Sequence, residues 1–246
     1  MIVLSHVHLA RPSKIKYLVE IVGTFILVYA VCSACTVYAG PNMLDGVVGI
    51  DKHSTIGIGL LVALLVTAIT YATAYRSGAQ INPAVTIALL VTGKIRAKEA
   101  ALFIACQILG AAIGAAVVYS MFGSAMAASL TLPADNNVIR ALILETIMTF
   151  TAVYVILTTL HNIKNNIAYA VGILAIGFAF GFNVILGGNV SGASMNPARS
   201  FGPALIVWNF DYQWIYWVAP ILGGLIASGL YMILHKDLDI PSPPPT

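Results

Sequence analysis

Charged side chains are scarce in this sequence. Asp, Glu, Lys and Arg together make up 9% of its 246 residues, whereas 59% are hydrophobic. Soluble globular domains carry about 25% charged residues, and several apolar runs here approach the ~20 residues that a membrane-spanning helix needs. The scarcity of charge therefore excludes a soluble protein and predicts one membrane domain over residues 1–246, without an appended soluble module.

Other features are missing as well. The formal net charge of +3 is too small to indicate a nucleic-acid partner, and no Cys/His cluster has metal-ligand spacing, so we expect no metal and no cofactor. The three cysteines lie in apolar runs; Cys32-x-x-Cys35 resembles a redox motif, but its surroundings favour packed core cysteines. Met1–Ala10 lacks a basic leader, so we expect no cleavable signal peptide.

The apolar runs predict an all-α membrane protein. Six runs are long enough to span, at about 15–39, 55–75, 97–121, 138–160, 167–186 and 214–235, and two at 83–91 and 197–207 are too short. Polar stretches at 41–54, 122–137 and 161–166 are expected to be loops, and Gly93 is a plausible helix cap. The Pro-rich tail at 241–246 is expected to be disordered.

Each short run follows an Asn-Pro-Ala triplet. Residues 77–84 read Ser-Gly-Ala-Gln-Ile-Asn-Pro-Ala, and residues 191–198 read Ser-Gly-Ala-Ser-Met-Asn-Pro-Ala. Asn is a good N-cap, and Pro fits the first helical position because its missing N–H needs no partner there. Both stretches therefore predict a loop that leads into the positive N-terminal end of a half-length helix.

The distribution of basic residues predicts the orientation. Six spans put both termini on the same side of the membrane. Of the basic residues, only Lys52 and Arg140 fall on the opposite side, and Arg199 lies beyond the second triplet. The positive-inside rule places both termini in the cytoplasm, so the half helices enter from opposite faces. The nine basic residues on the cytoplasmic side are Arg11, Lys14, Lys16, Arg76, Lys94, Arg96, Lys98, Lys164 and Lys236.

The sequence also predicts an internal repeat, with copies at about 15–121 and 138–235. Asn82 and Asn196 lie 114 positions apart, and Ile-Leu-Gly recurs at 108–110 and 221–223, 113 apart. Three spans and a half helix in each copy imply insertion in opposite orientations, as in other transport folds. Because irregular backbone at membrane depth is tolerated only when buried in protein or lining a watery cavity, two meeting loops predict a pore.

Two glutamates lie inside predicted spans, where a carboxylate is costly and is usually functional or paired. Glu20 and Glu145 each precede a Thr by four residues, at Thr24 and Thr149. A proton relay, an ion site and a structural acceptor for the loop backbone all remain open, and one Glu per repeat favours the structural role. Glycines at 110, 114, 223, 224 and 229 are expected to allow close helix packing.

The doubled signature Ser-Gly-x-x-x-Asn-Pro-Ala, with Asn-Pro-Ala-Arg-Ser-Phe-Gly-Pro after the second loop, resembles the aquaporin (major intrinsic protein) family over about Tyr17–His235. The resemblance implies six tilted helices, two re-entrant half helices, a pore in each subunit and a homotetramer. The pore centre would be formed by the two Asn-Pro-Ala triplets, Asn82, Pro83 and Ala84 with Asn196, Pro197 and Ala198. The asparagine amides would donate to water and, with the helix ends, repel cations and protons.

The resemblance also implies the remaining site residues. Backbone carbonyls of the two loops would accept hydrogen bonds along the pore, namely those of Gly78, Ala79, Gln80, Gly192, Ala193 and Ser194. Glu20 and Glu145 would support the loops. Arg199 would belong to an outer selectivity filter, completed by spacing with Val62, Val184 and Ala193. Strict water channels resemble one another in having an aromatic residue and a His where this chain has Val62 and Val184.

The expected function is therefore that of a passive channel for water. We do not expect an enzyme. The channel's apolar filter predicts weaker exclusion of small neutral solutes such as glycerol, or of gases, together with exclusion of ions and protons. An ion channel or ion-coupled transporter built on an inverted repeat is the alternative, although no acidic ring lines the predicted path. Short loops and tails indicate a microbial plasma membrane, where the expected partners are lipid and further copies of the chain.

Overall fold

The computed structural model describes residues 14–39, 52–162 and 165–235, and of residues 52–54, 161 and 162 it describes the backbone alone. The expectations for Met1–Ala10, for most of the loop at 41–54, for Lys164 and Lys236, and for the tail at 241–246 lie outside the described residues. The helices are α1 (Ile15–Ala39), α2 (Lys52–Ser77), α3 (Pro83–Val91), α4 (Ala97–Phe122), η2 (Gly123–Ser129), η3 (Ala134–Asn136), α5 (Val138–Asn162), α6 (Asn166–Ser191), α7 (Pro197–Val207) and α8 (Ile215–Leu234).

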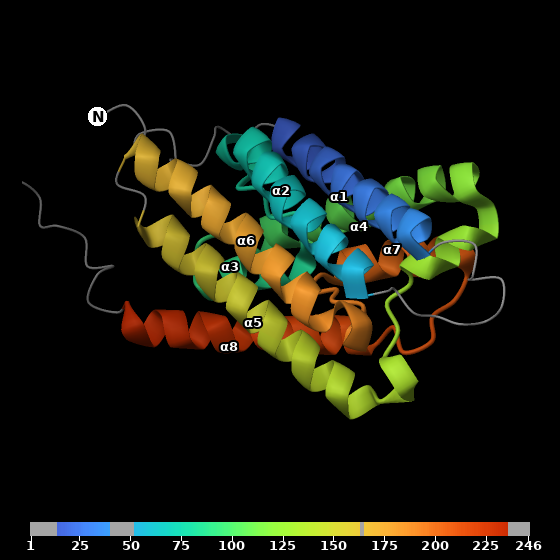
Figure 1. Ribbon diagram of the computed structural model, residues 1–246. Coiled ribbons are helices and arrows are strands. Elements are labelled where there is room, and N and C mark those ends of the chain that lie inside the picture. Colours follow the sequence, from blue (N-terminus) through green and yellow to red (C-terminus); the bar gives the residue numbers. More distant parts are fainter. Residues whose placement is uncertain (1–13, 40–51, 163–164, 236–246) are drawn as a thin grey trace, which may run out of the picture.

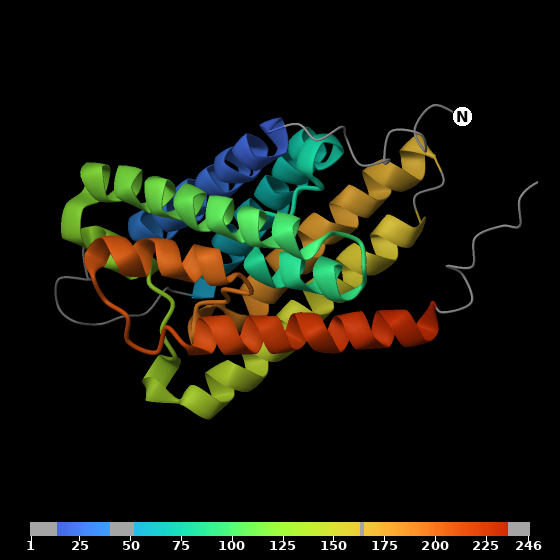
Figure 2. The same ribbon diagram turned by 180° about the vertical axis from the view of Figure 1, so that it is seen from behind.

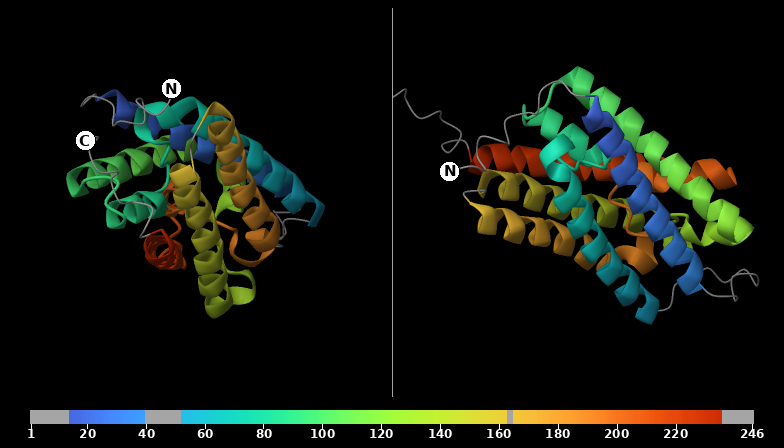
Figure 3. Two further views of the ribbon diagram at one scale, coloured as in Figure 1. Left: turned by 90° about the vertical axis from the view of Figure 1, so that its left-hand side faces the viewer. Right: turned by 90° about the horizontal axis from the view of Figure 1, so that it is seen from above.

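The predicted fold class is confirmed. Within the part of the chain that the structure describes, six helices are long and apolar enough to cross a membrane, and two half helices, α3 and α7, pack against them. These half helices lie in line between α4 and α8, and their N-terminal ends face each other near the middle of the bundle (Figures 1 and 2). The spanning helices are tilted against one another rather than parallel (Figure 3).

One predicted boundary is wrong, and one predicted loop is partly helical. Helix α6 does not stop near Leu186 but continues to Ser191 and ends at Gly192, whose φ is 81°. At membrane depth, helical backbone keeps its own N–H and C=O groups paired, which favours continuation through Gly187 and Gly188. The predicted loop at 122–137 contains two 3₁₀ segments, η2 and η3. By contrast, α3 ends as expected: Gly93, with φ 71°, and Lys94 donate backbone hydrogen bonds to Leu90 and Leu89.

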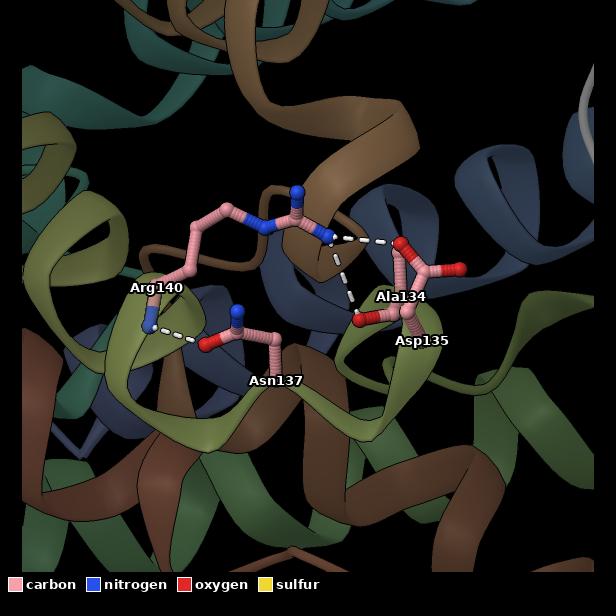
Figure 4. Close-up of polar contacts among 4 residues, drawn as sticks. All are labelled: Ala134, Asp135, Asn137 and Arg140. Atoms are coloured by element: carbon pink, nitrogen blue, oxygen red, sulfur yellow. Dashed lines mark hydrogen bonds and ion pairs between the residues drawn. The ribbon is translucent and has the colours of Figure 1, made fainter.

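The start of α5 is held by a local polar cluster, shown in Figure 4. The Asn137 side-chain oxygen accepts from the Arg140 backbone N–H at 3.0 Å, which caps the helix. The Arg140 guanidinium reaches back to the Ala134 carbonyl at 3.3 Å and the Asp135 carboxylate at 3.0 Å. Because this ion pair is exposed, it stabilises the fold little, and it serves mainly to fix the turn that leads into the helix.

Glycines set the closest helix contacts. A Cβ atom at Gly110 would lie 2.3 Å from the Ile21 carbonyl oxygen of α1, and one at Gly223 would lie 2.3 Å from the Thr146 carbonyl oxygen of α5. The pair α4 and α1 therefore packs through glycine in the same way as α8 and α5. Gly229 does not fit this pattern, because a Cβ there would meet nothing within 4 Å, so the prediction that it allows close packing is wrong.

Gly110→Ala is therefore expected to destabilise the bundle, because the added methyl collides with backbone rather than with a flexible side chain. Gly229→Ala is the matched control and should leave stability unchanged or raise it by up to about 1 kcal/mol through helix propensity. Thermal unfolding of both variants in the same detergent measures the difference. Equal midpoints for the two variants would contradict this account of the α1–α4 contact.

Candidate functional site

The side chains of Asn82 and Asn196 join the two loops at the centre of the bundle. Asn82 Nδ2 donates to the Met195 carbonyl at 2.8 Å, and Asn196 Nδ2 donates to the Ile81 carbonyl at 2.9 Å. Each asparagine therefore bonds to the residue that precedes the other one. An amide group carries two N–H donors, so one donor on each side chain holds the loops together and a second remains.

The oxygens of the same two side chains cap the half helices. Asn82 Oδ1 accepts from the Ala84 N–H at 2.9 Å, and Asn196 Oδ1 accepts from the N–H groups of Ala198 and Arg199 at 3.0 and 3.3 Å. This orientation fixes each amide with its oxygen toward the helix and its nitrogen away from it. Both helix N-termini, with their partial positive charge, consequently face the central region.

The two loops share an unusual backbone conformation. Gly78, Ala79 and Ile81 have φ values of 86°, 50° and 42°, and the corresponding Gly192, Ala193 and Met195 have 81°, 43° and 52°. Positive φ costs free energy at residues other than glycine and persists where the surroundings hold it. The same left-handed pattern at equivalent positions of both loops shows that their conformation is imposed by common contacts.

Buried glutamates supply those contacts. Glu20 accepts hydrogen bonds from the backbone N–H groups of Gln80 and Ile81 at 3.0 and 2.7 Å, and Glu145 accepts from those of Ser194 and Met195 at 2.8 and 2.7 Å. Both carboxylates are fully buried. Within the described residues, the hydrogen bonds to both carboxylates come from a loop or from side chains that support it, which favours the structural role over a proton relay or an ion site.

Additional donors complete both carboxylate sites. Gln107 Nε2 bonds to Glu20 at 2.8 Å and to the Thr86 hydroxyl at 2.9 Å, which ties α4 to the half helix α3. The Ser191 hydroxyl donates to Glu145 at 2.6 Å, and the Tyr216 hydroxyl donates to the Ser191 carbonyl at 2.8 Å. Sequence reasoning did not identify Gln107 as part of the site, because nothing in its local pattern distinguishes it from a packed glutamine.

A cavity runs along the loops and contains all four expected filter residues, Val62, Val184, Ala193 and Arg199, in its lining. Both asparagines line it as well. The remaining wall is largely apolar and includes Leu27, Val31, Ile58, Val66, Ile176 and Phe180, none of which the sequence singled out. We call this space the outer cavity.

Arg199 is 6% exposed and lies in the wall of the outer cavity. Its Nη1 donates to the Ser129 carbonyl at 2.8 Å, and its Nη2 lies 3.9 Å from Cys35 Sγ. Segment η2, which was expected to be loop, therefore positions the guanidinium. Cys35 is buried, as expected of a core cysteine, but it also lines the cavity beside Arg199.

A second cavity, the inner cavity, adjoins the first. It is lined by Gly78, Thr159, Leu160 and Tyr169 among others, near the end of the bundle where α5 ends and α6 begins (Figure 1). Ala79 lines both cavities, whereas Gln80, Gly192 and Ser194 line the outer one. The residues after each asparagine, Pro83, Ala84, Pro197 and Ala198, line neither cavity and are buried in the first turns of α3 and α7.

Gln80 is nearly enclosed, with 3% of its surface exposed. Its backbone N–H is held by Glu20, whereas its side-chain oxygen has no hydrogen-bond partner among the described residues. The side chain therefore contributes an unpaired acceptor beside the outer cavity. Its sequence position alone gave no indication of this.

Known proteins resemble this chain in sequence and in fold. Residues 8–231 match the family model described as Major intrinsic protein. Aquaporin Z of Rhodopseudomonas palustris is 34% identical over 236 residues, covering 90% of this chain and 94% of the relative. The probable aquaporin TIP4-1 of Oryza sativa subsp. japonica is 36% identical over 214 residues, covering 87% and 84%. The aquaglyceroporin structure from Plasmodium falciparum superposes with a TM-score of 0.72 at 24% identity, covering 92% and 98%, which supports the fold.

Proposed function

The chain belongs to the major intrinsic protein family and is a passive membrane channel for water and small solutes rather than an enzyme; we propose that its solutes pass in single file through the outer and inner cavities. The observation that carries this proposal is the cross-bonded pair Asn82 and Asn196, each with an amide donor left at the junction of two helix N-termini. A path through a folded-in loop also explains why irregular backbone is tolerated at membrane depth.

The pore centre is proposed to exclude protons and cations. Two helix N-termini and two amide donors make the centre locally positive. A water molecule that accepts from both asparagines has both lone pairs engaged with protein, so it cannot receive a proton from the next water. Loop carbonyls of Gly78, Ala79, Gln80, Gly192, Ala193 and Ser194 are proposed to accept hydrogen bonds from the waters on either side.

The outer filter is proposed to consist of Val62, Val184, Ala193 and Arg199. Three of these side chains are small and apolar, so polar contacts come mainly from the guanidinium and from backbone carbonyls. We infer a wider and less polar constriction than in a strict water channel, which admits glycerol-sized neutral solutes or gases more readily. Neither cavity is lined by an Asp or Glu among the described residues, which disfavours an ion channel or an ion-coupled transporter.

Val62→Phe combined with Val184→His is expected to lower glycerol permeability severalfold, because the two larger side chains narrow the filter. Water permeability should fall less, since water is the smaller solute. Stopped-flow light scattering of reconstituted vesicles, with glycerol and with an impermeant osmolyte, measures both rates. Val66→Phe, a matched change at another residue of the same cavity wall and the same helix, tests whether the effect belongs to the filter position.

An unchanged glycerol rate in the double variant would count against the filter assignment. A wild-type glycerol rate equal to that of empty vesicles would instead show that the apolar filter excludes polyols. Water flux in the wild type separates both cases from an inactive preparation.

The remaining assignments are also proposals. We propose that both termini are cytoplasmic, because basic residues gather on the side where α8 ends. We also propose a homotetramer, as the resemblance to the family implies, and a microbial plasma membrane, because the loops and tails are short. The two halves of the chain, about 15–121 and 138–235, are proposed to be inverted copies. Matching loop conformations, matching glutamate contacts and matching glycine contacts support that proposal.

A further inference from the structure

The outer and inner cavities meet at a ring of five residues that line both of them: Thr70, Ala79, Val85, Ile156 and Ile176. We call this ring the inner neck. Asn82 and Asn196 line only the outer cavity, so the inner neck lies beyond the pore centre, on the way to the inner cavity. A solute that crosses the protein by the proposed path passes both places.

The side chains of the inner neck are apolar except for one. Ala79, Val85, Ile156 and Ile176 offer no side-chain hydrogen bond, and Thr70 carries a hydroxyl. The backbone carbonyl of Ala79 can accept a hydrogen bond from a passing water, but among the side chains of the ring only Thr70 offers a donor. Apolar constrictions lose their water and close by dewetting. A hydroxyl can donate one hydrogen bond and accept two, so a single threonine can change whether water remains in the ring.

The Thr70 hydroxyl is also available for such a bond. Its neighbours along α2 donate to their own helix, Thr67 to the Ala63 carbonyl at 2.8 Å and Thr73 to the Ile69 carbonyl at 2.6 Å. Within the described residues, Thr70 makes no comparable hydrogen bond, although only 7% of its surface is exposed. Threonines in helices commonly bond back to the preceding turn, so a buried threonine that does not do so is free to bind a molecule in the neck.

We propose that Thr70 is a solute-binding residue of the channel: its hydroxyl binds a water molecule or a solute hydroxyl in the inner neck and keeps the neck hydrated. This inference rests on the proposed path through both cavities. It assigns a polar contact to the inner half of the path, separate from Arg199 and from the two asparagines. Solutes that can exchange hydrogen bonds with a hydroxyl are favoured there.

Thr70→Val tests the inference, because valine keeps the branched shape of threonine and removes only the hydroxyl. Losing one hydrogen bond to a passing water should lower water permeability by about tenfold, with a parallel fall for glycerol. Thr70→Ser keeps the hydroxyl and should retain most of the rate. Thr73→Val is the matched control on the same helix, since that hydroxyl is bonded to Ile69 and lines neither cavity.

Stopped-flow measurements on vesicles with equal amounts of reconstituted protein supply the readout. If Thr70→Val and Thr73→Val conduct water as fast as an active wild type, the inference is wrong while the proposed function stands. If the wild type itself does not conduct, the proposed function fails instead. Should Thr70→Val not assemble, Thr70→Ala also removes the hydroxyl, and a rate at or above the wild-type value would equally overturn the role of Thr70.

Discussion

Glu145→Ala is expected to abolish water conduction, because it removes the acceptor that holds the second loop. Three donors lose their partner inside the bundle: the Ser191 hydroxyl and the backbone N–H groups of Ser194 and Met195. Each buried unsatisfied donor costs about 1–3 kcal/mol, so the total is comparable with the 5–15 kcal/mol by which proteins are typically stable. We expect most of the variant to be recovered aggregated rather than as a folded channel.

The measurement is the yield of monodisperse protein in detergent, followed by water permeability of whatever reconstitutes. Glu145→Gln keeps one acceptor oxygen and should lie between the wild type and the alanine variant. Glu99→Ala is the matched control, because Glu99 forms an ion pair with Lys16 near the end of the bundle and contacts neither loop. Full yield and full water flux from Glu145→Ala would show that the loop holds its conformation without the carboxylate.

Arg199→Val is expected to raise proton and sodium permeability at least tenfold while leaving water permeability close to the wild-type value. The guanidinium is charged at all relevant pH values, and at an effective dielectric constant of about 20 a unit charge 4 Å away contributes about 4 kcal/mol to the barrier for a cation. Valine removes that barrier at the outer filter. The central asparagines remain, so exclusion is weakened rather than lost.

Proton flux into vesicles that contain a pH-sensitive dye and sodium flux into vesicles that contain a sodium-sensitive dye measure the two changes under imposed gradients. Arg199→Lys keeps the charge while losing the planar guanidinium, so it should preserve cation exclusion and separate charge from shape. Arg140→Val is the surface control, because that side chain belongs to the exposed cluster before α5. If the Arg199→Val channel is as impermeable to cations as the wild type, the assignment of Arg199 to the filter is wrong.

Several features could be predicted from sequence because they are local. The half helices α3 and α7 have the predicted bounds, since an asparagine cap followed by proline defines a helix start within three residues. The end of α6 could not be predicted in the same way. The predicted run ended at about Leu186, but membrane burial favours continued backbone pairing through Gly187 and Gly188 up to Gly192.

Contacts between distant segments lay beyond sequence reasoning. The bond from Asn82 to the Met195 carbonyl depends on how the two loops meet, and the bond from Arg199 to Ser129 depends on the position of η2. Thr70 is one of several threonines on α2, and the sequence does not distinguish it from Thr67 or Thr73. Only the combination of cavity lining and hydrogen bonding does so.

The central claim is that the paired loops form a pore that conducts water and excludes protons. It is tested most directly by measuring osmotic water flux and proton flux on the same reconstituted vesicles, with empty vesicles as the reference. Our account predicts water permeability at least tenfold above the reference, with a low activation energy, and proton permeability equal to it. Water flux no faster than in empty vesicles, or proton flux that rises with the amount of protein, would contradict it.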